Sequence, residues 1–270
     1  MTWVTRWLAA LLMGTAAGWC APMCRLQLAS AQANINAQRF AAALADTEQC
    51  LAEEPLHSAA LVLKGNLLYL LGRDVEAMTL LEDLVRREPF NTDGRYALGR
   101  VYYFNARPDP ACTQFEAIVA AQPDHYRAWD NLGLAREAAG RIPEAIQAHV
   151  RAIALVATAH REYDWAHANL AELLMKEDDN RRAFSLAVEA AERNPQSSRN
   201  FYLAGKALTR LEQWSKAERW LRRSAELDPT DAAPHYLLAQ LYRRLERPTE
   251  ADAERKLFLE LQAKAPDKRR

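Results

Sequence analysis

A small apolar residue recurs along the chain at a nearly constant interval. The intervals between successive positions are 34, 34, 34, 38, 34 and 34 residues. A period of this length predicts a stack of repeated helical units, each burying its apolar side against its neighbours. The positions are Ala43, Ala77, Ala111, Ala145, Ala183, Ala217 and Ala251.

Glycine and proline mark the ends of the expected helices in the same period. Gly72 and Gly140 stand where a first helix ends, as left-handed C-terminal caps. Pro143 and Pro248 stand where a second helix begins, a position at which the missing amide donor costs nothing. Prolines also close five of the repeats, because proline cannot continue a helix interior; these are Pro55, Pro89, Pro123, Pro195 and Pro229.

The central repeat resembles the tetratricopeptide repeat (TPR). Trp129 lies three residues before Leu132-Gly133, and Glu144-Ala145 completes the motif in the second helix. The resemblance implies an all-α fold, a right-handed superhelical solenoid of about seven helix–turn–helix units. We expect these units within residues 24–265, at 24–57, 58–91, 92–125, 126–159, 164–197, 198–231 and 232–265.

The one irregular interval falls after the fourth unit. Residues 160–163 are additional there, and Ala157 replaces the closing proline. Four residues are close to one helical turn, so we expect the second helix of this unit to be extended while the same side of the helix still faces its neighbours.

The N-terminus has the order of features of a secretory signal peptide. Arg6 precedes the apolar run 7–14, and the small residues 15–18 follow. The run is shorter than the roughly 20 apolar residues that span a bilayer. We therefore expect a signal peptide in residues 1–23 and a mature protein that is exported, to a bacterial periplasm or as a secreted protein, with no membrane span.

Two cleavage points remain open, between residues 17 and 31. The earlier one is preferred, because the later one removes part of the first repeat. An uncleaved leader would leave the protein membrane-anchored. A lipoprotein signal fits less well, because Trp19 and Met23 rather than small residues precede Cys20 and Cys24.

Charge and motifs exclude several classes of function. The chain carries 35 basic and 35 acidic side chains, whereas nucleic-acid-binding proteins usually carry a basic excess. No phosphate loop, dinucleotide fingerprint, nucleophile elbow or zinc-protease motif is present. We therefore expect no enzyme, no cofactor, no metal site and no nucleic-acid partner. A mild polarity remains, since residues 198–270 hold 16 Lys and Arg against 11 Asp and Glu, and the scattered His149, His167 and His235 fall on core positions.

Two cysteines lie within the repeats beyond Cys24. Cys50 and Cys112 belong to the first and third units, and solenoid units contact only their neighbours. We expect the two to be too far apart for a disulfide and to be buried thiols.

The resemblance also indicates a binding surface, since the first helices of TPR arrays line a concave groove. Helical spacing leaves a stripe of aromatic, amide and cationic side chains on these helices, the types enriched in interfaces. The predicted groove residues are Asn131, Asn169, Tyr96, Arg100, Tyr103, Arg127, Trp165, Arg199, Tyr202, Lys206 and Arg210.

Asn131 and Asn169 occupy equivalent places in successive units. The pair is similar to the asparagine ladder in the TPR domain of O-linked N-acetylglucosamine transferases, where amides hold a peptide backbone. An amide can donate and accept at once, as a peptide group does. We expect a protein partner bound through an extended segment. The alternative is an assembly factor of a cell-envelope complex, docking through its convex face or its C-terminal end. Leu257, Leu259 and Leu261 make self-association through the last unit a further possibility.

Overall fold

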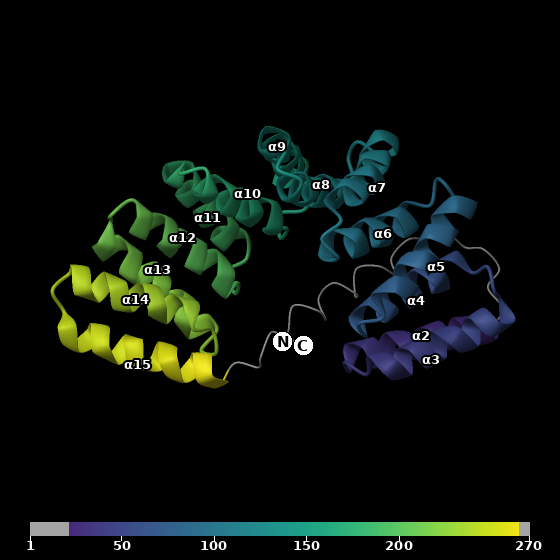
Figure 1. Ribbon diagram of the computed structural model, residues 1–270, viewed down its shortest axis with the longest axis horizontal. Coiled ribbons are helices and arrows are strands. Elements are labelled where there is room, and N and C mark those ends of the chain that lie inside the picture. Colours follow the sequence, from purple (N-terminus) through teal and green to yellow (C-terminus); the bar gives the residue numbers. More distant parts are fainter. Residues whose placement is uncertain (1–21, 265–270) are drawn as a thin grey trace. The chain divides into compact units, whose positions relative to one another are not determined.

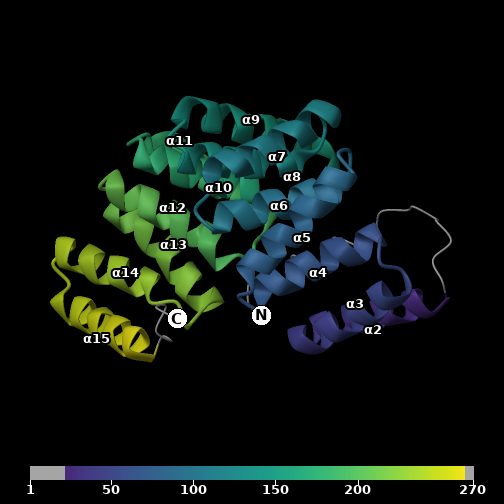
Figure 2. The same cartoon turned by 45° about the vertical axis from the view of Figure 1, so that its right-hand side comes forward.

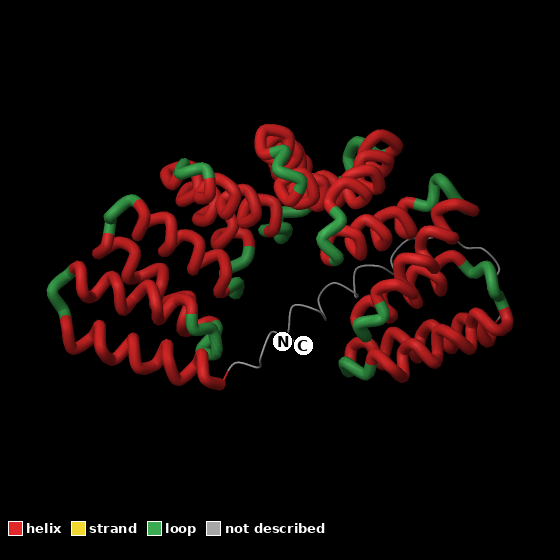
Figure 3. The backbone as a smooth tube through the Cα atoms, viewed as in Figure 1, coloured by secondary structure: helices red, strands yellow, loops and turns green. Residues whose placement is uncertain are grey.

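The computed structural model describes residues 22–264, and every regular element in that range is a helix (Figures 1 and 3). The expected all-α fold is thereby confirmed. Most of the predicted signal peptide, including Cys20, and the charged tail 266–270 lie outside the described residues. Between residues 22 and 264, no helix is both long and apolar enough to cross a membrane.

The chain divides into two compact units, residues 1–141 and 142–270. The first contains α2 Pro22–Asn36, α3 Phe40–Glu53, α4 Ser58–Leu70, α5 Asp74–Arg87, α6 Thr92–Phe104, α7 Pro108–Ala121 and α8 Tyr126–Ala138. The second contains α9 Ile142–Ala159, α10 Trp165–Lys176, α11 Asn180–Arg193, α12 Ser198–Arg210, α13 Trp214–Leu227, α14 Ala233–Arg244 and α15 Pro248–Lys264. Within each compact unit, helices adjacent in sequence pack against one another, such as α2 with α3 and α14 with α15 (Figure 2).

The periodic alanines are buried at the helix crossings. All seven are at most 1% exposed. Three glycines of first helices allow the same close approach. A Cβ at Gly65 would lie 2.7 Å from the Leu81 side chain, one at Gly99 would lie 2.8 Å from Phe115, and one at Gly205 would lie 2.6 Å from Leu221. The repeat period therefore marks where backbones approach most closely, and a larger side chain would force them apart.

Each turn between the two helices of a pair contains one residue with positive φ. Gly72 and Gly140 have φ of 74° and 75°, which confirms their expected role as caps. The amide of Gly72 donates to Tyr69 O at 3.0 Å, and that of Arg73 donates to Leu68 O at 2.9 Å, satisfying carbonyls at the end of α4. The same conformation occurs at five residues that are not glycine: Gln38, Ala106, Asp178, Glu212 and Glu246.

Helix α9 is longer than the other second helices of its unit. It has 18 residues, whereas α11 and α13 have 14 each and α15, the last helix, has 17. The expected extension of this helix is confirmed, and residues 160–164 then form the loop to α10. One added helical turn absorbs the insertion.

The prediction for Cys50 is wrong. Its sulfur is bonded to Cys24, with 4.3 Å between the Cα atoms, and the disulfide joins α2 to α3. The distance between repeats excludes Cys112 as the partner of Cys50, but Cys24 lies within the same repeat, at the edge of the predicted signal peptide. In the structure Cys24 lies in the first turn of α2, beside the end of α3. Cys112 is a free, buried thiol, as expected.

Candidate interaction surfaces

First helices contact one another within each compact unit. In the first unit α4 packs against α6 and α6 against α8; in the second unit α10 packs against α12 and α12 against α14. This arrangement places the side chains of successive first helices next to each other. The stripe expected from the sequence can therefore be described as two sets of residues, one in each unit.

In the first unit, Asn131 is bonded to another predicted groove residue. Its Nδ2 donates to Tyr96 Oη at 3.0 Å and to Arg127 O at 2.8 Å. Asn131 and Tyr96 are buried, at 8% and 9% exposure. Both amide hydrogens are thus used inside the fold, which leaves the carbonyl oxygen Oδ1 as the group able to accept a bond from a ligand.

An aromatic cluster extends this set toward α4. The Tyr69 and Phe104 rings stack with centroids 5.6 Å apart, and Tyr103 meets Phe104 edge-on at 5.3 Å. The Arg100 guanidinium lies 5.6 Å from the Phe104 centroid. Phe104 is 53% exposed. The cluster offers an apolar surface with a cation beside it, a combination suited to binding an aromatic or acidic side chain.

The arginines of this set also act on Tyr96. Burial raises the pKa of Tyr96, and the positive charges of Arg100 and Arg127 partly oppose that increase. The Tyr96 hydroxyl therefore stays protonated at neutral pH and can accept the bond from Asn131.

In the second unit, Arg199 connects three neighbours. Its Nη2 donates to Asn169 Oδ1 at 3.0 Å and to Glu172 Oε2 at 2.7 Å, so that α12 is tied to α10. Its guanidinium lies 5.4 Å from the Trp165 ring. Burial would raise the pKa of Glu172, but the hydrogen bond and charge of Arg199 outweigh it and hold that pKa below its ordinary value.

Three other predicted residues lie farther along α12. Lys206 Nζ is 5.7 Å from the Tyr202 ring, and burial raises the pKa of the Tyr202 hydroxyl. Arg210 donates to Met175 O and lies 3.8 Å from Asp178. Arg210 therefore serves the C-terminal end of α10, where cations and donors are favourable.

The structure thus joins Asn131 with Tyr96 and Arg127, and Asn169 with Arg199 and Trp165. The two asparagines belong to different compact units, and each has partners within its own unit. The ladder therefore stays a prediction that rests on the equivalent positions of the two residues.

Glu172 is the residue whose role the sequence reasoning missed. It lies on the same stripe, but its carboxylate offsets the charge of Arg199. A second omission is the run Arg219-Trp220-Leu221-Arg222-Arg223 in α13, where cations alternate with an aromatic residue on a second helix. The composition of this run is the feature of the sequence that could have identified it.

One cluster in the described residues has ligand atoms close enough for a metal ion. The sulfurs of Cys24 and Cys50 and a ring nitrogen of His57 lie within 4.8 Å of one another. The two sulfurs are bonded to each other, however, and His57 Nδ1 accepts a hydrogen bond from the amide of Ala60 at 3.1 Å. A disulfide supplies no thiolate ligands for a metal.

Solved structures with similar architecture are TPR proteins and related helical repeats. A structure reported for Pseudomonas aeruginosa pilF is 18% identical, with a TM-score of 0.65, and the match covers 77% of this chain and 97% of that one. A tetratricopeptide repeat protein from Parabacteroides merdae is 12% identical, with a TM-score of 0.67 and coverage of 91% and 94%. MamA from Desulfovibrio magneticus is 23% identical, with a TM-score of 0.54 and coverage of 65% and 97%. At these identities the likeness concerns the fold.

Sequence comparisons give the family. No curated protein sequence is matched by the chain. One tetratricopeptide repeat model matches residues 96–163, and a second matches residues 35–101 and 174–241. These ranges cover more than half of the chain and include residues of both compact units. The protein therefore belongs to the tetratricopeptide repeat family, whose repeats mediate protein–protein interaction.

Proposed function

We propose that the protein binds an extended segment of a partner protein along its first helices. The observation that carries this proposal is the concentration of aromatic, amide and cationic side chains on α4, α6 and α8 and again on α10, α12 and α14. Such side chains supply large contact areas and directed hydrogen bonds where proteins meet.

The first helices of each compact unit would bind such a segment by different chemistry. In the first unit, the rings of Tyr69, Tyr103 and Phe104 give apolar contact and Asn131 Oδ1 accepts a backbone amide. In the second unit, Tyr202 and Lys206 offer a ring and a cation side by side. Because Glu172 offsets Arg199, we assign the attraction for acidic side chains to Lys206 rather than to Arg199.

Site-specific crosslinking in cells tests this proposal. A photo-reactive residue at Tyr103 or Tyr202 should capture one and the same partner, and peptide mapping of the adduct should find a contiguous segment. Matched controls are Thr79 and Ser185, which are exposed on the second helices α5 and α11. Capture at Thr79 or Ser185 without capture at Tyr103 or Tyr202 would reject the first helices as the binding surface. That result would favour an assembly factor docked through its second helices.

The asparagine pair allows a sharper test once a segment is identified. The double substitution Asn131→Ala with Asn169→Ala should weaken binding by about 1–3 kcal/mol for the lost hydrogen bonds. Because both residues also bond within the fold, the melting temperature must be measured in parallel. Unchanged affinity in a folded double variant would exclude the ladder.

We further propose that the protein is exported. The disulfide between Cys24 and Cys50 supports export, because disulfides persist mainly in oxidising compartments. It also favours the earlier cleavage point, since cleavage after residue 31 would remove Cys24. Sequencing the mature N-terminus should find a start between residues 18 and 24. A start at Met1 would contradict cleavage, and a start at Gln32 would contradict the disulfide.

A further inference from the structure

An open pocket lies along α13, the second helix of the sixth repeat, and includes four residues of the run 219–223. Its volume is about 600 Å³, and seven of its eight lining residues belong to α13. Pockets of this size accommodate a few side chains or a small ligand. The eighth lining residue is Phe201 of α12.

Two neighbouring aromatic rings, Trp220 and Phe201, line one side of the pocket. The Trp220 centroid lies 5.6 Å from that of Phe201 and 6.0 Å from that of Phe184, which Trp220 meets edge-on. Trp220 is therefore held between aromatic residues of α11 and α12. A ring fixed in this way loses little conformational entropy when a ligand packs against it.

Two arginines of α13 lie beside these rings. Arg219 lies 5.9 Å from the Trp220 centroid, and Arg223 lies 6.0 Å from the Phe201 centroid. Arg223 also pairs with Glu226 at 3.1 Å, on the exposed surface of the helix. Exposed pairs of this kind are weak and exchange readily. Within the described residues, Arg219 has no carboxylate within salt-bridge distance.

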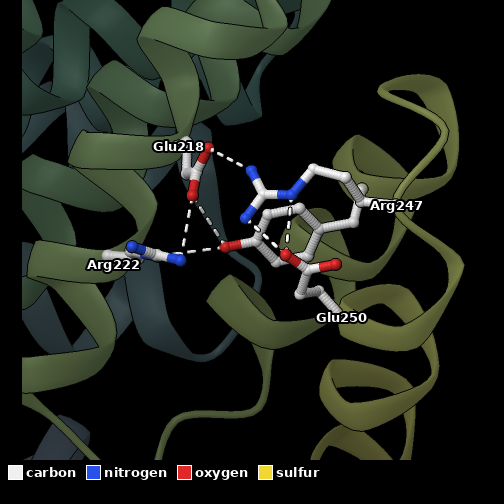
Figure 4. A network of polar contacts seen from close by, with 5 residues as sticks. Glu218, Arg222, Arg247 and Glu250 are labelled. Carbon is white, nitrogen blue, oxygen red and sulfur yellow. Dashed lines mark hydrogen bonds and ion pairs between the residues drawn. The ribbon is translucent and has the colours of Figure 1, made fainter.

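The carboxylate of Glu218 is engaged elsewhere. It accepts from Tyr242 Oη at 3.0 Å, and it pairs with Arg222 and Arg247 at 2.9 Å each (Figure 4). Arg247 in turn pairs with Glu250 at 2.7 Å. This network joins α13 to α14 and α15 and offsets the charge of Arg222. The lining therefore holds three arginines against two glutamates, and Arg219, beside the Trp220 ring, is the cation that neither glutamate pairs with.

We propose that this pocket binds an acidic segment of a partner protein, one that carries an aromatic side chain next to carboxylates. The carboxylates would pair with Arg219 and Arg223, and the ring would pack on Trp220. Planar guanidinium groups suit carboxylates because they can donate two parallel hydrogen bonds. The positive charges of Arg219 and Arg223 favour an acidic segment over a neutral or basic one.

The pocket is separate from the proposed first-helix surface. Tyr202 follows Phe201 directly in α12, and successive helical residues point about 100° apart around the axis. The two surfaces can therefore be tested independently with variants of the same full-length protein.

The test uses a fluorescein-labelled peptide, Asp-Glu-Phe-Asp-Glu-Phe, titrated at low ionic strength and followed by fluorescence anisotropy. The double variant Arg219→Gln with Arg223→Gln and the single variant Trp220→Leu should each weaken binding by about tenfold or more, as expected for central interface residues. Lys216→Gln, which removes a cation from the first turn of α13 outside the pocket, should leave the affinity within about twofold. Arg219 is exposed, so Arg219→Gln should not change the melting temperature.

Several outcomes would overturn this inference. They are unchanged affinity in the Arg219 and Arg223 double variant, an equal loss in Lys216→Gln, and equal binding of a Lys-Lys-Phe-Lys-Lys-Phe peptide. Loss of binding in Tyr202→Ala with Lys206→Gln, but not in the pocket variants, would move the peptide to the first-helix surface; that result overturns the pocket and leaves the proposed function standing. Equal binding of single-stranded DNA, lost in the pocket variants, would reject the acidic peptide as the ligand.

Discussion

At the scale of single residues, different side chains can fill the same structural role in successive repeats. Three first helices begin with a side chain that accepts from the amide three residues on: His57 for α4, Asn91 for α6 and His125 for α8. Asparagine and the unprotonated histidine nitrogen supply the same acceptor. The two residue types differ in that only histidine titrates near neutral pH.

The N-cap of α8 should therefore make stability depend on pH. Burial lowers the pKa of His125 below its ordinary value of 6.5, and protonation of Nδ1 would remove the acceptor for the amide of Ala128. The stability contributed by the neutral form is present above pH 6.5 and is lost as the pH falls from there through the folded-state pKa. His125→Asn should change the unfolding free energy at pH 7 by less than about 1 kcal/mol and should lose less stability down to pH 5. Urea unfolding at several pH values checks this, with His160→Asn in the loop after α9 as control; equal pH dependence in wild type and His125→Asn would contradict it.

Two glycines should respond to alanine for different reasons. Gly205→Ala places a Cβ 2.6 Å from Leu221 and should cost about 1–3 kcal/mol through overpacking. Gly72→Ala meets no atom within 4 Å but requires φ of 74°, so it should cost about 1–2 kcal/mol through backbone strain alone. Enlarging each residue further separates the causes: Gly205→Val should cost more than Gly205→Ala, whereas Gly72→Asn should restore most of the loss. A smaller loss of stability in Gly205→Val than in Gly205→Ala, together with no regain of stability in Gly72→Asn, would contradict these two causes.

At the scale of elements, cross-connections between helices determine how firmly each pair is held. Arg199 ties α12 to α10, and Glu218 ties α13 to α14 and α15. The Cys24–Cys50 disulfide ties α2 to α3, the first pair among the described helices. This pair packs against α4 on one side, and the covalent bond adds a restraint where interior pairs have packing from two neighbours.

Loss of the disulfide should destabilise the first helix pair. The cysteines are 26 residues apart, and closing a loop of this length stabilises a fold by roughly 3 kcal/mol in the chain-entropy account. Cys24→Ser with Cys50→Ser should therefore increase hydrogen exchange in α2 and α3 before other helices are affected. Adding a reductant should reproduce the effect in the wild type and change nothing in the double variant. Exchange in α2 and α3 that is unaffected by either treatment would contradict a stabilising disulfide.

At the scale of the whole molecule, the protein is an array in which stability depends on neighbouring repeats. Within each compact unit, helices adjacent in sequence pack on one another, so a local change is expected to spread over short distances along the chain. The free thiol of Cys112, buried in α7, offers a reporter in one repeat for perturbations made in another.

Protection of Cys112 should be insensitive to destabilisation of the sixth repeat. Gly205→Ala should accelerate hydrogen exchange in α12 and α13, while the rate at which a thiol reagent labels Cys112 in native buffer stays within about twofold, as expected for nearest-neighbour coupling. Gly99→Ala, which brings a Cβ 2.8 Å from Phe115 on the same helix as Cys112, is the positive control and should accelerate labelling. Equal acceleration by both variants would indicate a single cooperative unit.

The sequence by itself determined the repeat period, the helix pairs and the glycine caps at Gly72 and Gly140, because these depend on residues close together in the chain. Alanine at a crossing, glycine with positive φ and proline at a helix end express local geometry that recurs every 34 residues. The extension of α9 was predictable for the same reason, since an insertion of four residues corresponds to one helical turn.

Tertiary structure alone decided which distant side chains meet. Asn131 gives both of its amide hydrogens to the fold, Glu172 offsets Arg199, and Cys24 reaches Cys50 across a helix pair. Residues that share a helix face can be identified from spacing, but their bonding partners depend on how neighbouring helices pack. The side chains available to a protein partner are those that this packing leaves uncommitted, and the period of the repeat does not contain that information.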